Sequence, residues 1–272
     1  MQDSEAATAS LAPRDRSGRA APTPLVLLLG SLSFGTVLLF LIGLHSVFLT
    51  FAGLYYVWVV TPTAVCFVYT ESRRRVLEGW RRGIRRWWHQ LAMSVPLGVG
   101  LIGCCLLAYR YLGRWIGIVP QHLRERLVQY GLARASSPYA IPPADIAVIL
   151  WLSLLNPMME EFFWRLFLFE LLRNPEAGGE CRRWWGPAWL VSGLYASYHV
   201  PIVASILPVY LAALAFFALT AAGLALQLLA ERRGVVMAFG VHAAADMFVC
   251  LVLADVVWSL GIEANPVNAT AV

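Results

Sequence analysis

The sequence predicts an all-α integral membrane protein, a polytopic helical bundle of about seven transmembrane helices. The 272 residues are 59% hydrophobic and 14% charged, with a mean hydropathy of +0.65, whereas soluble domains have about one-quarter charged residues. Apolar runs long enough to cross a bilayer follow one another along the chain. The basic residues that give the net charge of +5 gather between these runs, which indicates membrane topology and lipid headgroups rather than nucleic acid as a partner.

The N-terminal half is predicted to consist of a polar tail followed by three membrane spans. Residues 1–24 have too little apolar surface to fold, so we expect a disordered polar tail. Residues 25–112 hold the first three spans, and the first is too long to be a signal-peptide core. The segment 71–90 is rich in arginine and tryptophan, which is typical of an amphipathic helix on the membrane surface. Its positive charge places the loop after span two, and with it the N-terminus, in the cytoplasm. The expected spans are 25–44, 47–69 and 91–112.

The C-terminal half is predicted to hold four further spans. A polar connection, 113–144, precedes this transmembrane core at 145–260, and a short polar tail, 261–272, follows it. Basic turns after the fourth and sixth spans are again expected on the cytoplasmic side. Pro201 is expected to end the fifth span, because a proline removes a helical hydrogen bond. The expected spans are 146–172, 184–199, 208–230 and 235–260.

Charged residues inside the fourth span are the most unusual feature of the sequence. Glu160, Glu161 and Arg165 lie within a run that is otherwise apolar. A charge near the bilayer centre costs between about 3 and more than about 10 kcal/mol, so each of them needs a partner or a function. Glu161 and Arg165 are four residues apart and can form an ion pair on one helix face. Glu160 points about 100° away and has no local counter-ion, so we predict that it is functional.

Two other spans carry ionisable groups to a similar depth. His199 lies in the fifth span, and His242 and Asp246 lie in the seventh. His242 and Asp246 are four residues apart, as are Tyr195 and His199, so each pair shares a helix face. These groups suit a hydrolytic site, in which a carboxylate takes a proton from water while imidazoles position it and stabilise an oxyanion. A divalent metal such as zinc is an equal alternative, with Glu160, His199, His242 and Asp246 as ligands.

The residues fall into three ordered motifs, Glu160-Glu161-x-x-x-Arg165, Tyr195-x-x-x-His199 and His242-x-x-x-Asp246. In this order, each in its own span, they resemble the motifs of the CAAX-protease and bacteriocin-processing (CPBP, or Abi) intramembrane proteases over roughly residues 145–250. The resemblance implies an intramembrane endopeptidase with a membrane-embedded catalytic cavity and a membrane-associated substrate, with or without a prenyl group. It also implies that Glu160 activates water, His199 helps to hold it and His242 stabilises the oxyanion, with the fourth motif position, Asp246, beside it.

Two positions depart from the pattern of the resembled family. Tyr195 stands where Phe is common, which keeps an aromatic ring, and Asp246 stands where the prenyl-protein branch usually has Asn. An ionised Asp cannot donate a hydrogen bond to an oxyanion. Asp246 must therefore be protonated, paired with His242 or bound to a metal. The substitution argues against a prenyl-CAAX substrate and favours the broader bacterial-type branch. We expect a bacterial plasma membrane rather than an endoplasmic reticulum membrane.

Two other classes of function stay open. A proton-coupled transporter could use Glu160, His199, His242 and Asp246 as a relay, because ionisable residues inside membranes also mark such paths. A family member without catalysis could act as a membrane scaffold or immunity protein. Glu161, Arg165 and Tyr195 are expected to support the site rather than to react. Among these readings the intramembrane endopeptidase, glutamic-type or metal-dependent, is the leading hypothesis.

Overall fold

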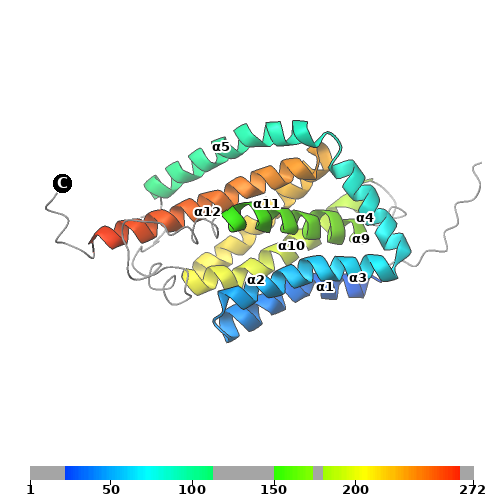
Figure 1. The fold of residues 1–272 in the computed structure, drawn as a ribbon, viewed down its shortest axis with the longest axis horizontal. Coiled ribbons are helices and arrows are strands. Elements are labelled where there is room, and N and C mark those ends of the chain that lie inside the picture. Colours follow the sequence, from blue (N-terminus) through cyan, green and yellow to red (C-terminus); the bar gives the residue numbers. More distant parts are fainter. Residues whose placement is uncertain (1–21, 113–149, 174–179, 264–272) are drawn as a thin grey trace, which may run out of the picture.

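The computed structural model describes residues 22–112, 150–173 and 180–263. These residues are nearly all helical and contain no strand, which confirms the predicted fold class (Figure 1). Six of their helical stretches are long and apolar enough to cross a membrane. The remaining predicted span is helical from Leu150 to Leu172 but carries four charged residues. The six stretches are Thr23–Gly43, Phe48–Val68, Trp87–Tyr111, Trp184–Ile206, Val209–Arg233 and Val235–Val252.

Three of the predicted regions lie wholly or partly outside the described residues. The predicted tail 1–24 lies almost wholly outside the described residues, and the predicted connection 113–144 lies wholly outside them. The predicted C-terminal tail, 261–272, is described only as far as residue 263.

The N-terminal half forms two membrane-spanning segments, a polar helix and a third span. Ser46 begins the second segment, where its Oγ accepts a hydrogen bond from the Leu49 amide at 3.2 Å. Pro62 lacks an N–H to donate to the preceding turn, and that turn is π-helical. The elements are α1 (Thr23–Val37), η1 (Leu38–Gly43), α2 (Val47–Tyr55), η2 (Tyr56–Val60), α3 (Thr61–Val68), α4 (Thr70–Gly83) and α5 (Trp87–Leu112), where η marks a π-helical turn.

The C-terminal half begins with a helical segment that alternates between α and π turns. Its elements are η3 (Trp151–Leu155), α8 (Asn156–Glu160), η4 (Glu161–Leu168) and α9 (Phe169–Leu172). Three long helices follow, α10 (Glu180–Ile206), α11 (Val209–Arg233) and α12 (Val235–Glu263). The prediction that Pro201 ends the fifth span is wrong, because α10 continues through it to Ile206. Neighbouring helices can compensate for the lost backbone hydrogen bond in a transmembrane bundle, and Pro201 is buried.

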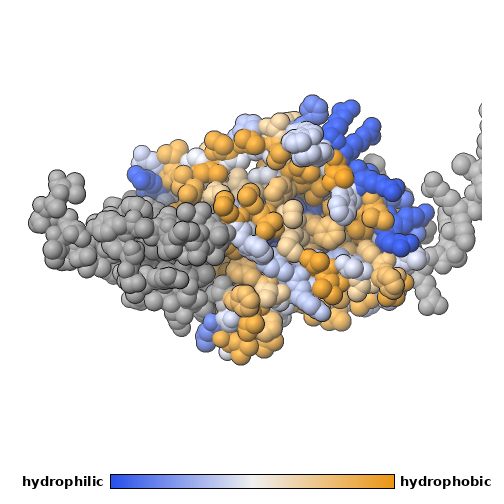
Figure 2. Space-filling model, in the orientation of Figure 1, coloured by the Kyte–Doolittle hydropathy of each residue, from blue (hydrophilic) through white to orange (hydrophobic). Residues whose placement is uncertain are grey.

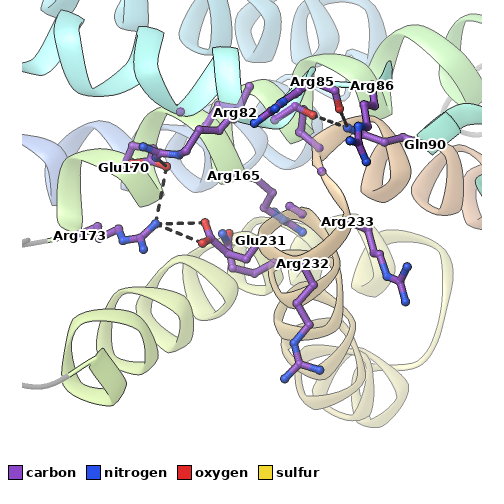
Figure 3. Close-up of a pocket in the computed structure, with 17 residues that line it drawn as sticks. Arg82, Arg85, Arg86, Gln90, Arg165, Glu170, Arg173, Glu231, Arg232 and Arg233 are labelled. Carbon is purple, nitrogen blue, oxygen red and sulfur yellow. Dashed lines mark hydrogen bonds and ion pairs between the residues drawn. The ribbon is translucent and has the colours of Figure 1, made fainter. Parts of the chain in front are cut away.

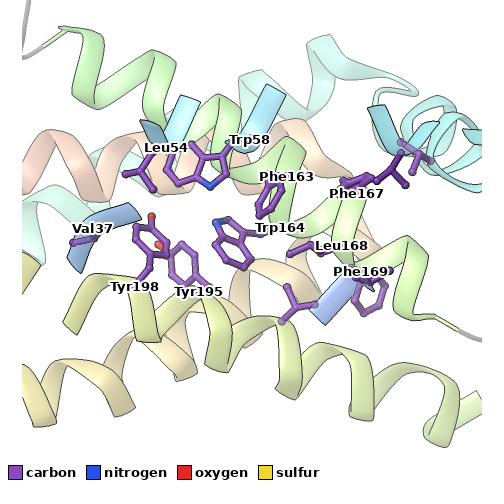
Figure 4. Close-up of a cluster of buried hydrophobic side chains, with 14 of the residues drawn as sticks. Val37, Leu54, Trp58, Phe163, Trp164, Phe167, Leu168, Phe169, Tyr195 and Tyr198 are labelled. Atoms are coloured by element: carbon purple, nitrogen blue, oxygen red, sulfur yellow. The ribbon is translucent and has the colours of Figure 1, made fainter. Parts of the chain in front are cut away.

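Aromatic side chains from η2, η4 and α10 meet in the core of the bundle (Figure 4). Trp164 of η4 stacks on Tyr198 of α10, with ring centroids 5.7 Å apart and an interplanar angle of 2°. Trp58 of η2 packs against Phe163 and Tyr198 at 6.4 and 5.8 Å, and its Nε1 donates to Ser33 of α1 at 3.0 Å. Because these rings fill the space between η4 and α10, they hold the first two sequence motifs in a fixed relation.

Basic residues from distant parts of the chain meet at one end of the bundle. Arg82 of α4 pairs with Glu170 of α9 at 2.7 Å, and Arg173 pairs with Glu231 of α11 at 3.1 Å. Figure 2 shows the hydrophilic surface gathered at the end where α4 lies. We expect this end to face the cytoplasm, because positively charged loops are retained there.

The contact between α5 and α12 leaves no room for a side chain at Gly240. A Cβ at this position would overlap the Cβ and Oγ of Ser94. We predict that Gly240→Ala destabilises the protein by about 1–3 kcal/mol, as overpacking of a tight contact does. Gly100→Ala on α5 is the control, since no heavy atom lies within 4 Å of its Cβ.

The unfolding temperatures of both variants are measured in detergent. Adding Ser94→Gly to Gly240→Ala should recover part of the loss, because it removes the overlapping side chain. Equal unfolding temperatures for the Gly240→Ala and Gly100→Ala variants would contradict this packing.

Candidate active site

Three spans bring acid, hydroxyl and imidazole groups together inside the bundle. Glu160, the last residue of α8, lies with its Oε2 3.8 Å from Nε2 of His242 on α12. The same Nε2 lies 3.7 Å from Asp246 Oδ1 and 3.2 Å from the Tyr195 hydroxyl of α10. Glu160 is 1% exposed and His242 is 4% exposed. Three residues named from the sequence, Glu160, Tyr195 and Asp246, therefore surround Nε2 of the fourth, His242.

Glu161 binds the other nitrogen of the same imidazole. Its Oε1 accepts a hydrogen bond from His242 Nδ1 at 2.8 Å, and its Oε2 lies 3.5 Å from Arg165 Nε, the predicted ion pair. The Arg165 guanidinium lies over the Tyr195 ring, 4.6 Å from its centroid. Because the Nδ1 proton points at Glu161, the opposite ring edge is held toward Glu160.

The two adjacent glutamates thus contact opposite edges of one ring. They also lie where α8 changes to the π-helical η4, between Glu160 and Glu161. Such π-helical turns occur frequently at functional sites.

Asn156 was not assigned a role from the sequence. Its Nδ2 donates to Glu160 Oε1 at 2.5 Å, from one turn earlier on the same helix. The spacing of four residues could have indicated this contact. Among the described residues, no group donates a hydrogen bond to Glu160 Oε2. One oxygen of Glu160 is therefore held in place, while the other is available to accept a proton.

Tyr198 is a second residue that sequence reasoning missed. It is 1% exposed, and its hydroxyl interacts with the Glu160 carboxylate. Its ring packs on His199 with centroids 4.0 Å apart and on Tyr195 at 5.8 Å. Nothing in the amino-acid pattern distinguishes Tyr198 from other aromatic residues of the span, so only the fold identifies it.

His199 lies beside this cluster without touching its acidic groups. Its Nδ1 donates to the Tyr195 carbonyl oxygen at 2.9 Å, so Nδ1 carries the proton and Nε2 has a free lone pair. Its ring also contacts the Tyr195 ring at 4.7 Å. Within the described residues, no hydrogen bond or ion pair joins His199 to Glu160 or His242. His199 therefore lies near the site because its ring packs against the rings of Tyr195 and Tyr198.

Comparison with known proteins covers the region that holds these residues. Residues 142–248 match the model of a family described as type II CAAX prenyl endopeptidase Rce1-like. This match confirms the resemblance to the CPBP family. The Rce1-like region contains all three motifs and every residue of the candidate site. None of the curated proteins and none of the solved structures compared with the chain matched it.

The residues named as metal ligands do not form a metal site in this arrangement. Among the described residues, no three His, Cys, Asp or Glu side chains are grouped closely enough to hold a metal ion. His199 is turned to a backbone carbonyl, and Glu160 and Asp246 lie on one nitrogen of His242 at 3.7–3.8 Å. The predicted ligand His199 therefore does not join the other three around one centre within the described residues.

Proposed function

We propose that the protein is an intramembrane endopeptidase that hydrolyses a peptide bond of a membrane-associated protein. The supporting observation is the buried contact of Glu160 with His242 inside the Rce1-like region. A carboxylate with one held and one free oxygen is suited to take a proton from water. An imidazole with a fixed ring is suited to stabilise negative charge beside it.

The proposed reaction begins when Glu160 Oε2 takes a proton from a water molecule. The water oxygen attacks the carbonyl carbon of the substrate, and the carbonyl oxygen becomes an oxyanion. His242, in its imidazolium form, keeps one proton on Nδ1 toward Glu161 and donates the other from Nε2 to this oxyanion. The C–N bond then breaks, and the leaving amine takes the proton from Glu160. His199 Nε2, with its free lone pair, accepts a hydrogen bond from the water.

Tyr195 supplies the donor that Asp246 cannot supply. The resembled prenyl-protein branch usually has Asn at the position of Asp246, and Phe is common at the position of Tyr195. Here the Tyr195 hydroxyl lies 3.2 Å from His242 Nε2, on the side where the oxyanion would form. Compared with that branch, the chain thus has a hydroxyl donor at Tyr195 and lacks an amide donor at Asp246.

We predict that Tyr195→Phe lowers the cleavage rate about a hundredfold, as the loss of one oxyanion donor does. Adding Asp246→Asn to Tyr195→Phe should restore much of the rate, because an amide donor returns beside His242. Initial cleavage rates of the two single variants and the double variant measure this coupling. A double variant slower than Tyr195→Phe would argue against the exchange of donors.

The proposed substrate is a membrane-associated protein with a prenyl group. The family description names a prenyl endopeptidase, and the site lies among helices that are long and apolar enough to cross a membrane. The experiment uses the purified protein in nanodiscs with membrane-tethered peptides that carry or lack a prenyl group. We expect cleavage of the tethered peptides, with the prenylated form preferred. Intact peptides together with proton flux in liposomes would instead favour the transporter.

We also predict that a strong chelator leaves the cleavage rate unchanged, because within the described residues no three His, Cys, Asp or Glu side chains are grouped to hold a metal ion. The same peptides are assayed before and after chelation, with each of several divalent ions added back. Loss on chelation that one ion reverses would make Asp246 a metal ligand and would overturn the metal-free mechanism.

A further inference from the structure

A cavity of about 570 Å³ opens at the basic end of the bundle (Figure 3). It lies between α4, α9, the end of α11 and the start of α12. Gln90 fixes its shape, because its Nε2 donates to the Gly83 and Arg85 carbonyls at 3.0 and 2.6 Å while its Oε1 accepts from the Val236 amide at 3.0 Å. Six arginines surround the opening, Arg82, Arg85, Arg86, Arg173, Arg232 and Arg233.

The positive charge around the opening is only partly balanced. Glu170 and Glu231 are the acidic residues that line the cavity within the described part of the chain, and they pair with Arg82 and Arg173. The four other arginines around the opening have no ion pair with any described residue. Four arginines that line the cavity thus carry charges that no carboxylate of the described residues neutralises.

Arg165 reaches the same cavity from the active site. It is 2% exposed and lines the cavity, and its Nη1 and Nη2 have no hydrogen-bond acceptor among the described residues. Only its Nε faces a carboxylate, that of Glu161, at 3.5 Å. A buried guanidinium with unused donors is costly. Its position indicates that a negatively charged ligand approaches it from the cavity.

Exposed tryptophans beside the cavity indicate that it lies at the depth of lipid headgroups. Trp80 at the end of α4 and Trp87 and Trp88 at the start of α5 flank the turn that lines it. Their exposed fractions are 43%, 43% and 66%. Exposed tryptophans are typical of the interface between hydrocarbon and water. A phospholipid beside this turn would bring its phosphate to the level of the arginines.

We propose that this cavity binds the phosphate of an anionic phospholipid headgroup. The non-bridging oxygens of a phosphate diester match the paired donors of a guanidinium, and arginines near a membrane surface attract anionic lipids. Seven arginines face two glutamates here, so the cavity has a positive charge in excess that an anionic headgroup can neutralise. The bound headgroup also holds Arg165, and through it Glu161, in place.

Lipid binding is measured without substrate, so its failure is separate from failure of the proteolytic function. The purified protein is titrated with phosphatidylglycerol, with phosphatidylcholine and with inorganic phosphate, and retained lipid is counted by native mass spectrometry. We compare Arg232→Gln/Arg233→Gln with the control Arg73→Gln/Arg81→Gln. The control removes the same charge from exposed positions of α4 that do not line the cavity.

We expect phosphatidylglycerol to bind more tightly than phosphatidylcholine, and Arg232→Gln/Arg233→Gln to weaken it about tenfold. The control should change affinity by less than about twofold, because its charges lie outside the cavity and are screened by salt. Equal losses in both double variants would mean diffuse attraction and would overturn the site. Competition by inorganic phosphate alone would assign it to a soluble anion. Displacement by a peptide with a free C-terminal carboxylate, but not by its amide, would assign it to the substrate.

Discussion

Glu160→Gln is expected to lower the cleavage rate about 10²–10⁴-fold while the protein stays folded. The amide keeps the shape of the side chain, and its oxygen can still accept the hydrogen bond from Asn156. It cannot take a proton from water, so the chemical step loses its base. Glu160 is also not the carboxylate that pairs with Arg165. Its neutralisation therefore leaves the buried ion pair intact.

The control for Glu160→Gln replaces a glutamate outside the site. Glu78 is exposed on α4, and Glu78→Gln should leave the cleavage rate unchanged. Initial rates and unfolding temperatures are measured on the wild type and both variants under the same conditions. A Glu160→Gln variant that cleaves within tenfold of the wild type would remove Glu160 from the mechanism.

Glu161→Gln is expected mainly to lower the stability of the protein, although Glu161 is adjacent to Glu160. Its carboxylate is 1% exposed, accepts the Nδ1 hydrogen bond of His242 and pairs with Arg165. Removing it leaves a buried arginine without its carboxylate, a change that typically costs about 3–5 kcal/mol. The unfolding temperature should therefore fall clearly below that of Glu160→Gln.

A second substitution distinguishes this cause from simple loss of packing. Glu161→Gln combined with Arg165→Met should be more stable than Glu161→Gln alone, because no unpaired charge remains buried. Its cleavage activity should stay low, since the His242 ring has lost its charged acceptor. Equal unfolding temperatures for wild type and Glu161→Gln would contradict the structural role of the ion pair.

Much of the candidate site could be predicted because charge is costly inside an apolar span. Glu160, His242 and Asp246 stand out for that reason, and helical spacing places Glu161 beside Arg165. These are local properties, so a sequence without any structure carries them. The order of the motifs then indicated the family that the match over residues 142–248 supports.

What could not be predicted depends on how the helices pack. The contact of Glu161 with His242 spans 81 positions in the chain, and no spacing rule reaches that far. The local preference of Pro201 predicts the end of a span, but α10 continues through it to Ile206. The arginines of α4 and of the last turn of α11 indicated topology only. Their meeting around one cavity required the fold.

The most direct test of the central claim is the mass of the products formed in water enriched in ¹⁸O. The purified protein in nanodiscs is incubated with a prenylated, membrane-tethered peptide and a strong chelator. We predict cleavage of a peptide bond, with one ¹⁸O in the new carboxylate of the N-terminal fragment and no such product from Glu160→Gln. Intact peptide after incubation with the wild type, whose fold is verified by its unfolding transition, would contradict hydrolysis by a glutamate-activated water.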